Sequence, residues 1–474
     1  MMTLSRRIQK GTSLQIGARL FSAATNFVLS AVLLARVLTE GEFGLYQFYL
    51  TLFLLTMTLV DFGVNRAGVR MVAAKECPLG DAVIAAIALK AIAGGFAFLV
   101  LAMIALLAEP EGVTGWLLVL AAVHVLSHAA GSASIGFEVR LDFRVPAIGM
   151  VAGHTLFLLL GLLLYFCGVR HAAPYLVAWG AGIVSQNLLV LGAAWKRDQL
   201  GRRPDRQVLL QLAREALPLG VAAIAVALYF HMDTIMLRPL KGPEEVAEYA
   251  VAYRMMTVGL MVPALFMQVV FPVLTRCHEA SADLLRAVLR QCTFYMALIG
   301  GVAAAILLAL APELLALAFG EAYREAAPSL RILGLAMAAV FLCYPHSMVL
   351  IAAGQAARFT RITLLAALLN LALNLLLIPR FGAEGAAGTT LTTEMLVLLA
   401  SALAVRRHVG VTGVSARLIG VALLAGTVLL ANQLLGSRHP FLVNLPVFLL
   451  IALLGAALLK AWPLRIGVEE EEIA

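Results

Sequence analysis

The strongest constraint on this fold is a succession of apolar runs, each about 20 residues long, that fills nearly the whole chain. A helix rises about 1.5 Å per residue, so a run of this length crosses about 30 Å of membrane hydrocarbon. Because the runs are continuous rather than alternating, they indicate helices and argue against a barrel of strands. The sequence therefore predicts an all-α polytopic membrane protein.

The composition leads to the same class. Hydrophobic residues make up 62% of the chain and charged residues only 13%, whereas about a quarter of the residues in a soluble globular domain are charged. A soluble domain is excluded. Fourteen transmembrane helices are expected, at residues 12–36, 43–65, 82–108, 114–136, 145–168, 173–195, 215–237, 248–273, 290–311, 327–353, 360–378, 384–405, 415–434 and 441–461.

The distribution of Lys and Arg between the loops predicts the orientation. Loops on the side of the N-terminus carry 24 of these residues and loops on the opposite side carry 7. Cytoplasmic loops are enriched in Lys and Arg, so both termini are expected in the cytoplasm. The first helix is expected to remain as a signal anchor, because its apolar run is long and no small-residue cleavage site closes it. The net charge of +8 is then largely a topology signal, and it does not suggest a nucleic-acid partner.

A weak internal repeat with a period near 210 residues predicts two similar lobes. Residues 42–46 have a counterpart at 245–249, and residues 168–170 have one at 380–385. Each lobe holds six helices, an even number, so both lobes begin on the same side and the repeat is parallel. The two helices that follow lie outside the repeat.

The repeat also predicts the domain organisation. The predicted parts are an N-lobe of helices 1–6 at residues 1–195, a basic cytoplasmic linker at 196–214, a C-lobe of helices 7–12 at 215–405, and helices 13–14 with an acidic tail at 406–474.

Several short segments together resemble one known family. They are residues 36–46, the triplet Asp61-Phe62-Gly63, the helix around Asp233, and residues 370–387. In this order and spacing they resemble the polysaccharide transport family. That family includes the O-antigen and exopolysaccharide flippases, and it belongs to the multidrug/oligosaccharidyl-lipid/polysaccharide exporter superfamily.

The resemblance implies a function and partners. A member of this family would move an undecaprenyl-diphosphate-linked oligosaccharide from the cytoplasmic to the periplasmic leaflet of the bacterial inner membrane by alternating access. The expected partners are the lipid-linked glycan and membrane lipids, with a polysaccharide polymerase and glycosyltransferases as further candidates. Neither a cofactor nor an enzymatic activity is expected.

Four cations inside the predicted helices are candidate substrate-binding residues: Arg19, Lys90, Arg254 and Arg331. A cation within a membrane helix is costly, so it pairs with another group, reaches the interface or serves a function. An anionic diphosphate is a suitable partner for Arg and Lys. Because Arg331 lies only a few residues inside its helix, interfacial anchoring competes most strongly with substrate binding there.

Deeper polar residues are candidates for ion coupling. Glu394 lies near the middle of its helix, Asp233 lies near a helix end, and His124 and His154 can titrate near neutral pH. Structural contacts between helices are the competing interpretation for each histidine. His124 and His128 share one helix face, but no third ligand accompanies them, so no metal site is predicted.

Two other classes of function remain open. A cation-coupled drug exporter of the same superfamily would favour acidic and aromatic groups, whereas the charges within these helices lean positive. A membrane polysaccharide polymerase or ligase would be expected to carry a large periplasmic loop with clustered catalytic residues, whereas the periplasmic loops expected here are short.

Overall fold

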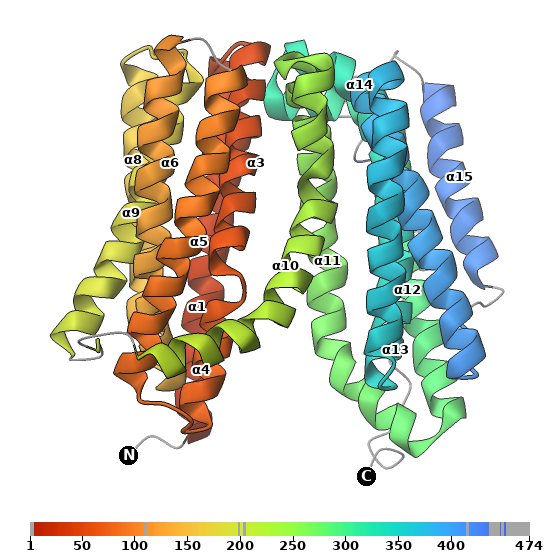
Figure 1. Cartoon of the computed structure of the whole chain (residues 1–474). Coiled ribbons are helices and arrows are strands. Elements are labelled where there is room, and N and C mark those ends of the chain that lie inside the picture. Colours follow the sequence, from red (N-terminus) through yellow and green to blue (C-terminus); the bar gives the residue numbers. More distant parts are fainter. Residues whose placement is uncertain are drawn as a thin grey trace. The chain divides into compact units, whose positions relative to one another are not determined.

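The structure is entirely helical in the part of the chain that it describes. This computed structural model describes residues 4–108, 111–197, 200–201, 205–413, 417–435, 446 and 450–451. Within these residues it contains helices and no strands (Figure 1). Eleven described segments are long and apolar enough to cross a membrane. The predicted all-α fold is confirmed, and the chain is a multi-pass membrane protein.

The helices form two compact units, Met1–Ile235 and Met236–Ala474. The helices of the first unit are α1 (Leu4–Asn26), the π-helix η1 (Phe27–Leu33), α2 (Leu34–Val37), α3 (Glu40–Asp61), α4 (Val64–Ala73), α5 (Leu79–Ala108), α6 (Glu111–Ala130), the 3-10 helix η2 (Gly131–Ala133), α7 (Ser134–Val139), α8 (Arg144–Phe166) and α9 (Ala172–Lys196). Helix α10 (Arg206–Lys241) runs through the boundary. The domain limits expected from the sequence remain predictions.

The second unit contains α11 (Pro243–Ala280), α12 (Ala282–Phe319), the 3-10 helix η3 (Glu321–Ala326), α13 (Ala327–Ala352), α14 (Ala356–His408) and α15 (Arg417–Leu435). Helix α14 is interrupted at Gly382, whose φ of 55° and ψ of −130° are not helical. The interruption separates the two helices predicted at 360–378 and 384–405. The last predicted helix, 441–461, lies almost entirely outside the described residues.

Two equivalent carboxylates identify the repeat in the structure. Glu42, in the first turn of α3, accepts a hydrogen bond from the backbone N–H of Ala172 at the start of α9, over 2.6 Å. Glu245, in the first turn of α11, accepts one from the N–H of Ala383 just after the break in α14, also over 2.6 Å. In each unit, a glutamate at the equivalent position therefore accepts a hydrogen bond from a backbone N–H that has no intrahelical partner because it lies at the start of a helix. These matched contacts are those of an internal repeat, as the sequence predicts.

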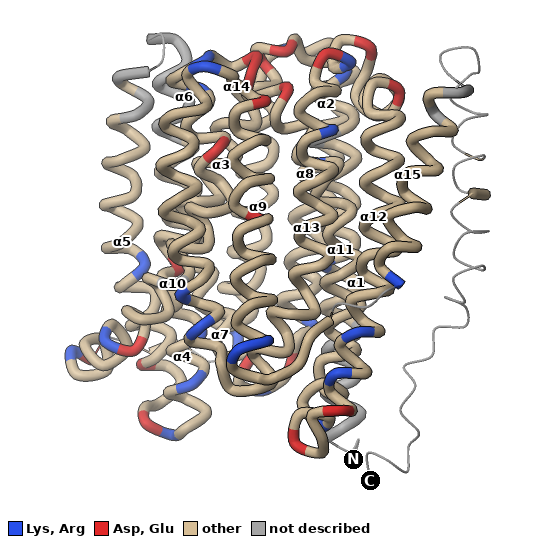
Figure 2. The backbone as a smooth tube through the Cα atoms, turned by 90° about the vertical axis from the view of Figure 1, so that its right-hand side faces the viewer, with Lys and Arg blue, Asp and Glu red and all other residues tan. Residues whose placement is uncertain are grey.

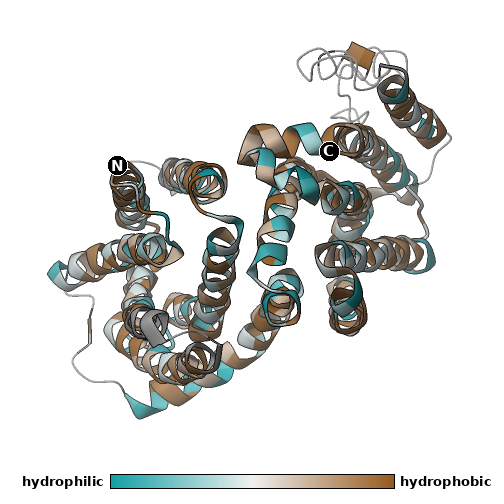
Figure 3. Ribbon diagram, turned by 90° about the horizontal axis from the view of Figure 1, so that it is seen from above, coloured by the Kyte–Doolittle hydropathy of each residue, from teal (hydrophilic) through white to brown (hydrophobic). Residues whose placement is uncertain are grey.

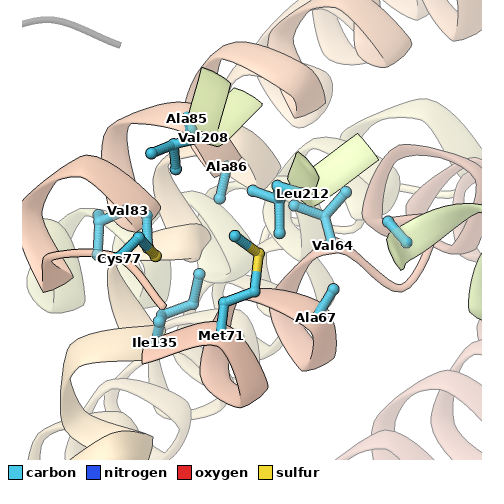
Figure 4. Packing of buried hydrophobic residues seen from close by; sticks show 12 residues of the cluster. Val64, Ala67, Met71, Cys77, Val83, Ala85, Ala86, Ile135, Val208 and Leu212 are labelled. Carbon is cyan, nitrogen blue, oxygen red and sulfur yellow. The ribbon is translucent and has the colours of Figure 1, made fainter. Parts of the chain in front are cut away.

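An apolar cluster attaches the first part of α10 to the rest of unit 1. Val208 and Leu212 of α10 pack with Met71 of α4 and Ala86 of α5 (Figure 4). At the edge of this cluster, the Arg70 side chain donates a 2.8 Å hydrogen bond to Glu215 of α10. Figure 1 shows this part of α10 running beside α4 before the helix turns upward. The amphipathic start of α10 is thus part of the folded unit.

Charged residues gather near the ends of the helices, and the long middle segments carry few of them (Figure 2). Seen along the helices, most of the ribbon is hydrophobic (Figure 3). Because a polar group in hydrocarbon is costly, the few polar groups deep within the described helices are the residues to inspect for function.

Candidate functional site

A polar pocket of about 480 Å³ lies within unit 1. This size falls in the range of about 300–1,000 Å³ that is usual for small-molecule sites. The polar residues that line it come from seven of the α-helices of this unit, and η2 contributes Gly131. The polar residues include Gln15, Arg19, Asp61, Asn65, Arg66, Lys90, His128, Ser134, Glu138, Gln186 and Asn187.

An ion pair with one buried partner lies in this pocket. Lys90 Nζ of α5 is 2.7 Å from Asp61 Oδ1 at the end of α3, and the side chains are 1% and 36% exposed. The lysine that the sequence analysis singled out is therefore neutralised by a carboxylate from the protein itself. Its pairing satisfies a charge that would otherwise be buried without a partner.

The backbone after Asp61 makes an unusual turn. Phe62 and Gly63 adopt left-handed conformations, with φ values of 42° and 73°, and α4 begins at the next residue. Glycine adopts this conformation at little cost, whereas phenylalanine rarely does. A Cβ atom at Gly63 would approach the Leu219 Cβ atom to 2.6 Å. Close packing against α10 thus accounts for the glycine, and the turn places Asp61 and Asn65 on the same pocket.

A short chain of hydrogen bonds forms another part of the pocket wall. The Ser134 hydroxyl donates to Glu138 Oε1 over 3.2 Å, and Asn65 Nδ2 donates to the Ser134 oxygen over 3.5 Å. Because the single serine proton goes to the carboxylate, the serine can only accept from Asn65. The amide nitrogen of Asn65 therefore faces Ser134. The charges of Lys90 and Arg19 lie close enough to Glu138 to interact with it electrostatically.

Three pocket-lining side chains each keep one buried polar atom that has no protein partner. The atoms are Asn65 Oδ1, His128 Nε2 and Asn187 Nδ2. Asn187 is 8% exposed. Buried polar groups are nearly always hydrogen-bonded, so these three atoms are the ones on pocket-lining residues whose hydrogen bonds the protein itself leaves unmade.

The structure brings two of the four predicted cations, Arg19 and Lys90, to this pocket. Arg254 is half-buried in α11, and Arg331 is exposed in α13, so both belong to the second unit. The Arg331 Nε atom donates a 3.2 Å hydrogen bond to the Leu308 carbonyl. Binding of substrate by any of the four remains a prediction.

The predicted coupling groups are dispersed among several helices. Asp233 is buried in α10 and Glu394 is half-buried in α14. His154 uses both ring nitrogens: Nδ1 donates to the Met150 carbonyl over 2.9 Å, so Nε2 accepts from the Ser22 hydroxyl over 2.6 Å. This arrangement joins α1 to α8 and provides a structural role for His154, while its coupling role stays a prediction.

His124 belongs to an aromatic group rather than to the pocket lining. Its ring centre lies 5.2 Å from that of Phe53 and 5.3 Å from that of Trp179. His128 is its neighbour at 5.3 Å and does line the pocket. Within the described residues, no three His, Cys, Asp or Glu side chains are grouped as a metal site would require.

Sequence reasoning did not single out Glu138 or Asn187 as site residues. Glu138 follows the predicted fourth helix and therefore looks like a loop residue. In the structure, η2 and α7 continue the chain beyond α6 and bring Glu138 to the pocket. Asn187 is a single amide within an apolar helix, and its polarity at mid-helix is the signal that could have identified it.

A buried network of polar residues in the second unit was also not predicted. Asn374 Nδ2 donates to Asn370 Oδ1 over 3.0 Å, and Asn370 Nδ2 donates to Thr393 Oγ1 over 3.5 Å. The first bond lies within the half of α14 that precedes the break at Gly382, and the second joins this half to the one that follows it. They pair amides and hydroxyls that would be costly in hydrocarbon.

A family model described as polysaccharide biosynthesis protein matches residues 8–278 of this chain, which is more than half of it. A second model, described as MatE, matches residues 218–376. Among curated proteins, none has a sequence that matches this one.

Several solved structures share the fold. The lipid II flippase MurJ in an inward closed conformation superposes with a TM-score of 0.76 at 12% identity, covering 95% of this chain and 100% of that one. An inward-facing multidrug resistance MATE family transporter of the MOP superfamily has a TM-score of 0.62 at 14% identity, over 83% and 94% of the two chains. A mutant of the Vibrio cholerae MATE transporter VcmN has a TM-score of 0.54 at 17% identity, covering 85% and 97%.

Proposed function

Because this chain belongs to the polysaccharide biosynthesis protein family, we propose that it is a flippase for a lipid-linked oligosaccharide. It would carry an undecaprenyl-diphosphate-linked glycan from the cytoplasmic to the periplasmic leaflet of the bacterial inner membrane, by alternating access. The single observation that carries the proposal is the family match over residues 8–278, a stretch that contains the whole polar pocket.

The chemistry of the pocket supports such a cargo. A flippase has to shelter a hydrophilic head from hydrocarbon while the isoprenoid tail stays in lipid. The pocket in unit 1 offers amides, hydroxyls and both signs of charge among apolar helices. Arg19 and Arg66 are exposed and line this pocket, so they are the cations best suited to meet a phosphate there.

The test is transbilayer movement in reconstituted vesicles. Undecaprenyl-diphosphate-N-acetylglucosamine would be placed in both leaflets, and an external galactosyltransferase with UDP-galactose would modify only the outer-leaflet sugar. With the protein present, modification should continue until the inner-leaflet lipid is also consumed. Modification that stops at the same level as in protein-free vesicles would overturn the proposal. Leakage of a trapped dye serves as the control for intact vesicles.

A drug exporter is the second candidate, favoured by the MatE match over residues 218–376. The carboxylates of Asp61 and Glu138 in the pocket would suit a cationic solute. Efflux of ethidium from drug-sensitive cells that express the protein tests this candidate. Efflux above the vector control, together with no lipid movement in vesicles, would replace the flippase proposal with the exporter.

A further inference from the structure

The three unmatched polar atoms of the pocket differ in what they need from a ligand. Asn187 Nδ2 can only donate a hydrogen bond, Asn65 Oδ1 can only accept one, and His128 Nε2 can do either, depending on its tautomer. The Asn65 nitrogen faces Ser134, so the oxygen of this amide is the atom that is left without a partner. A single ligand therefore has to supply both an acceptor and a donor.

This requirement separates ligand classes. An ionised phosphate only accepts hydrogen bonds, so it leaves Asn65 Oδ1 unmatched. A protonated amine only donates, so it leaves Asn187 Nδ2 unmatched. A hydroxyl group does both, and a ring with several hydroxyls can satisfy the three atoms at once.

The charges in the pocket agree with a neutral ligand beside these three side chains. Lys90 is neutralised by Asp61 over 2.7 Å, and Glu138 accepts a hydrogen bond from Ser134 and lies near the charges of Asp61, Lys90 and Arg19. Arg19 and Arg66 are exposed residues. The cations that could bind an anion are therefore on exposed side chains, whereas Asn187 is a buried and neutral amide.

We propose that this pocket holds the sugar that is attached directly to the diphosphate of the cargo, and that Asn187, Asn65 and His128 hydrogen-bond its hydroxyl groups. The proposal rests on the flippase function above and assigns the sugar subsite within it. The phosphate lies beside Arg19 and the first sugar reaches the neutral side chains. Gly131 keeps the position of Asn187 open, because a Cβ atom there would lie 2.9 Å from the Asn187 Oδ1 atom.

The experiment compares two kinds of lipid with the full-length protein in nanodiscs. One is undecaprenyl diphosphate without a sugar. The other is undecaprenyl diphosphate bearing N-acetylglucosamine or galactose. Dissociation constants would be measured by native mass spectrometry, with phosphatidylglycerol as the lipid that defines non-specific binding. The wild-type protein should bind at least one sugar-bearing lipid about tenfold more tightly than the sugar-free lipid, as one or two additional hydrogen bonds would give.

Variants show which residues cause the preference for the sugar-bearing lipid. Asn187→Leu should remove the preference for the sugar while leaving affinity for undecaprenyl diphosphate unchanged, and Gly131→Ala should reduce the preference by displacing the Asn187 amide. Arg19→Gln should weaken binding of both kinds of lipid by the same factor. Ser185→Ala, on the same helix as Asn187 but outside the pocket lining, is the matched control and should keep the wild-type ratio.

The possible failures can be told apart. If the wild-type protein binds both kinds of lipid equally, the sugar subsite is wrong although the flippase proposal stands. If neither lipid binds more tightly than phosphatidylglycerol, the flippase proposal fails and the subsite fails with it. A preference that survives both Asn187→Leu and Gly131→Ala in folded protein would also overturn the subsite. Should Asn187→Leu not fold, Gly131→Ala decides the result alone.

Discussion

At the scale of single residues, Lys90 shows why a buried charge has to be interpreted together with its partner. Alone in an apolar run, it suggests an anionic ligand. In the structure, Lys90 forms a 2.7 Å ion pair with Asp61. Asp61 is the last residue of α3, and an unusual turn follows it. The sequence could place both residues near the cytoplasmic side, but it could not show that the turn at Phe62 and Gly63 brings them together.

We expect Asp61→Asn to be destabilising because it leaves the Lys90 charge buried without its partner. The loss should be about 2–4 kcal/mol, somewhat below the figure for a fully buried pair because Asp61 is partly exposed. The double variant Asp61→Leu with Lys90→Met should recover most of the loss, since it removes both charges. Thermal unfolding followed by fluorescence size-exclusion chromatography measures both effects. Equal stability of the single variant and the wild type would contradict the importance of the pair.

A second residue-scale prediction concerns Gly382. An alanine there would adopt a φ of 55° with a ψ of −130°, and its Cβ would collide with the Glu245 carboxylate. Gly382→Ala should cost about 2–3 kcal/mol of unfolding free energy. Gly168→Ala is the control for backbone strain alone, because Gly168 has a φ of 73° and an open surrounding, and it should cost only about 1 kcal/mol. An equal loss for the two variants, measured by thermal unfolding, would mean that the collision is unimportant.

At the scale of elements, what the two repeats share is a contact at the start of a helix rather than a similar sequence. Glu42 and Glu245 each accept a backbone N–H from the first turn of a distant helix. A carboxylate at a helix N-terminus satisfies an N–H that lacks an intrahelical partner and interacts favourably with the helix dipole. The two glutamates were visible in the sequence as parallel motifs, but their partners became known only from the fold.

The two glutamates predict a reciprocal result in hydrogen exchange. Glu42→Gln should weaken the start of α9 by about 1 kcal/mol and speed exchange of the Ala172 amide, with no effect at Ala383. Glu245→Gln should do the reverse. Hydrogen–deuterium exchange with mass spectrometry reads both sites in one sample. Faster exchange at both sites in either single variant would show general destabilisation instead of loss of one bond.

The apolar runs predicted most helices because a spanning helix has to be both long and apolar. They could not predict the shorter elements. Helix α7 has only 6 residues, so it carries too little pattern to be recognised, yet it brings Glu138 to the pocket. Lone amides such as Asn187 were missed for a related reason: one polar residue hardly changes the hydropathy of a window, although its burial makes it chemically significant.

At the scale of the whole molecule, the loop charges predict which side faces the cytoplasm, and the cysteines allow a test. Cys167 is exposed just after α8, on the side predicted to be periplasmic. Cys77, on the predicted cytoplasmic side, is buried at 9% exposure, and burial raises the pKa of its thiol. A raised pKa leaves less thiolate at neutral pH, which slows alkylation.

A membrane-impermeant maleimide added to intact spheroplasts at pH 7 should therefore label the wild-type protein, and Cys167→Ser should abolish the labelling. Cys77→Ser should leave the signal unchanged. Labelling that occurs only in inverted membrane vesicles, with Cys167 still the target, would reverse the predicted orientation. Peptide mass spectrometry identifies the modified cysteine in each preparation.

Asn65, His128 and Asn187 keep hydrogen-bonding groups that the rest of unit 1 does not satisfy. A cargo that satisfies them makes the loaded carrier more stable than the empty one, and every bond gained on loading has to be broken before the cargo departs. Neutral hydrogen bonds are individually weaker than bonds to unpaired charges. If the proposed subsite holds the first sugar through amides and an imidazole, with the buried lysine already paired, these contacts would favour rapid turnover over long residence.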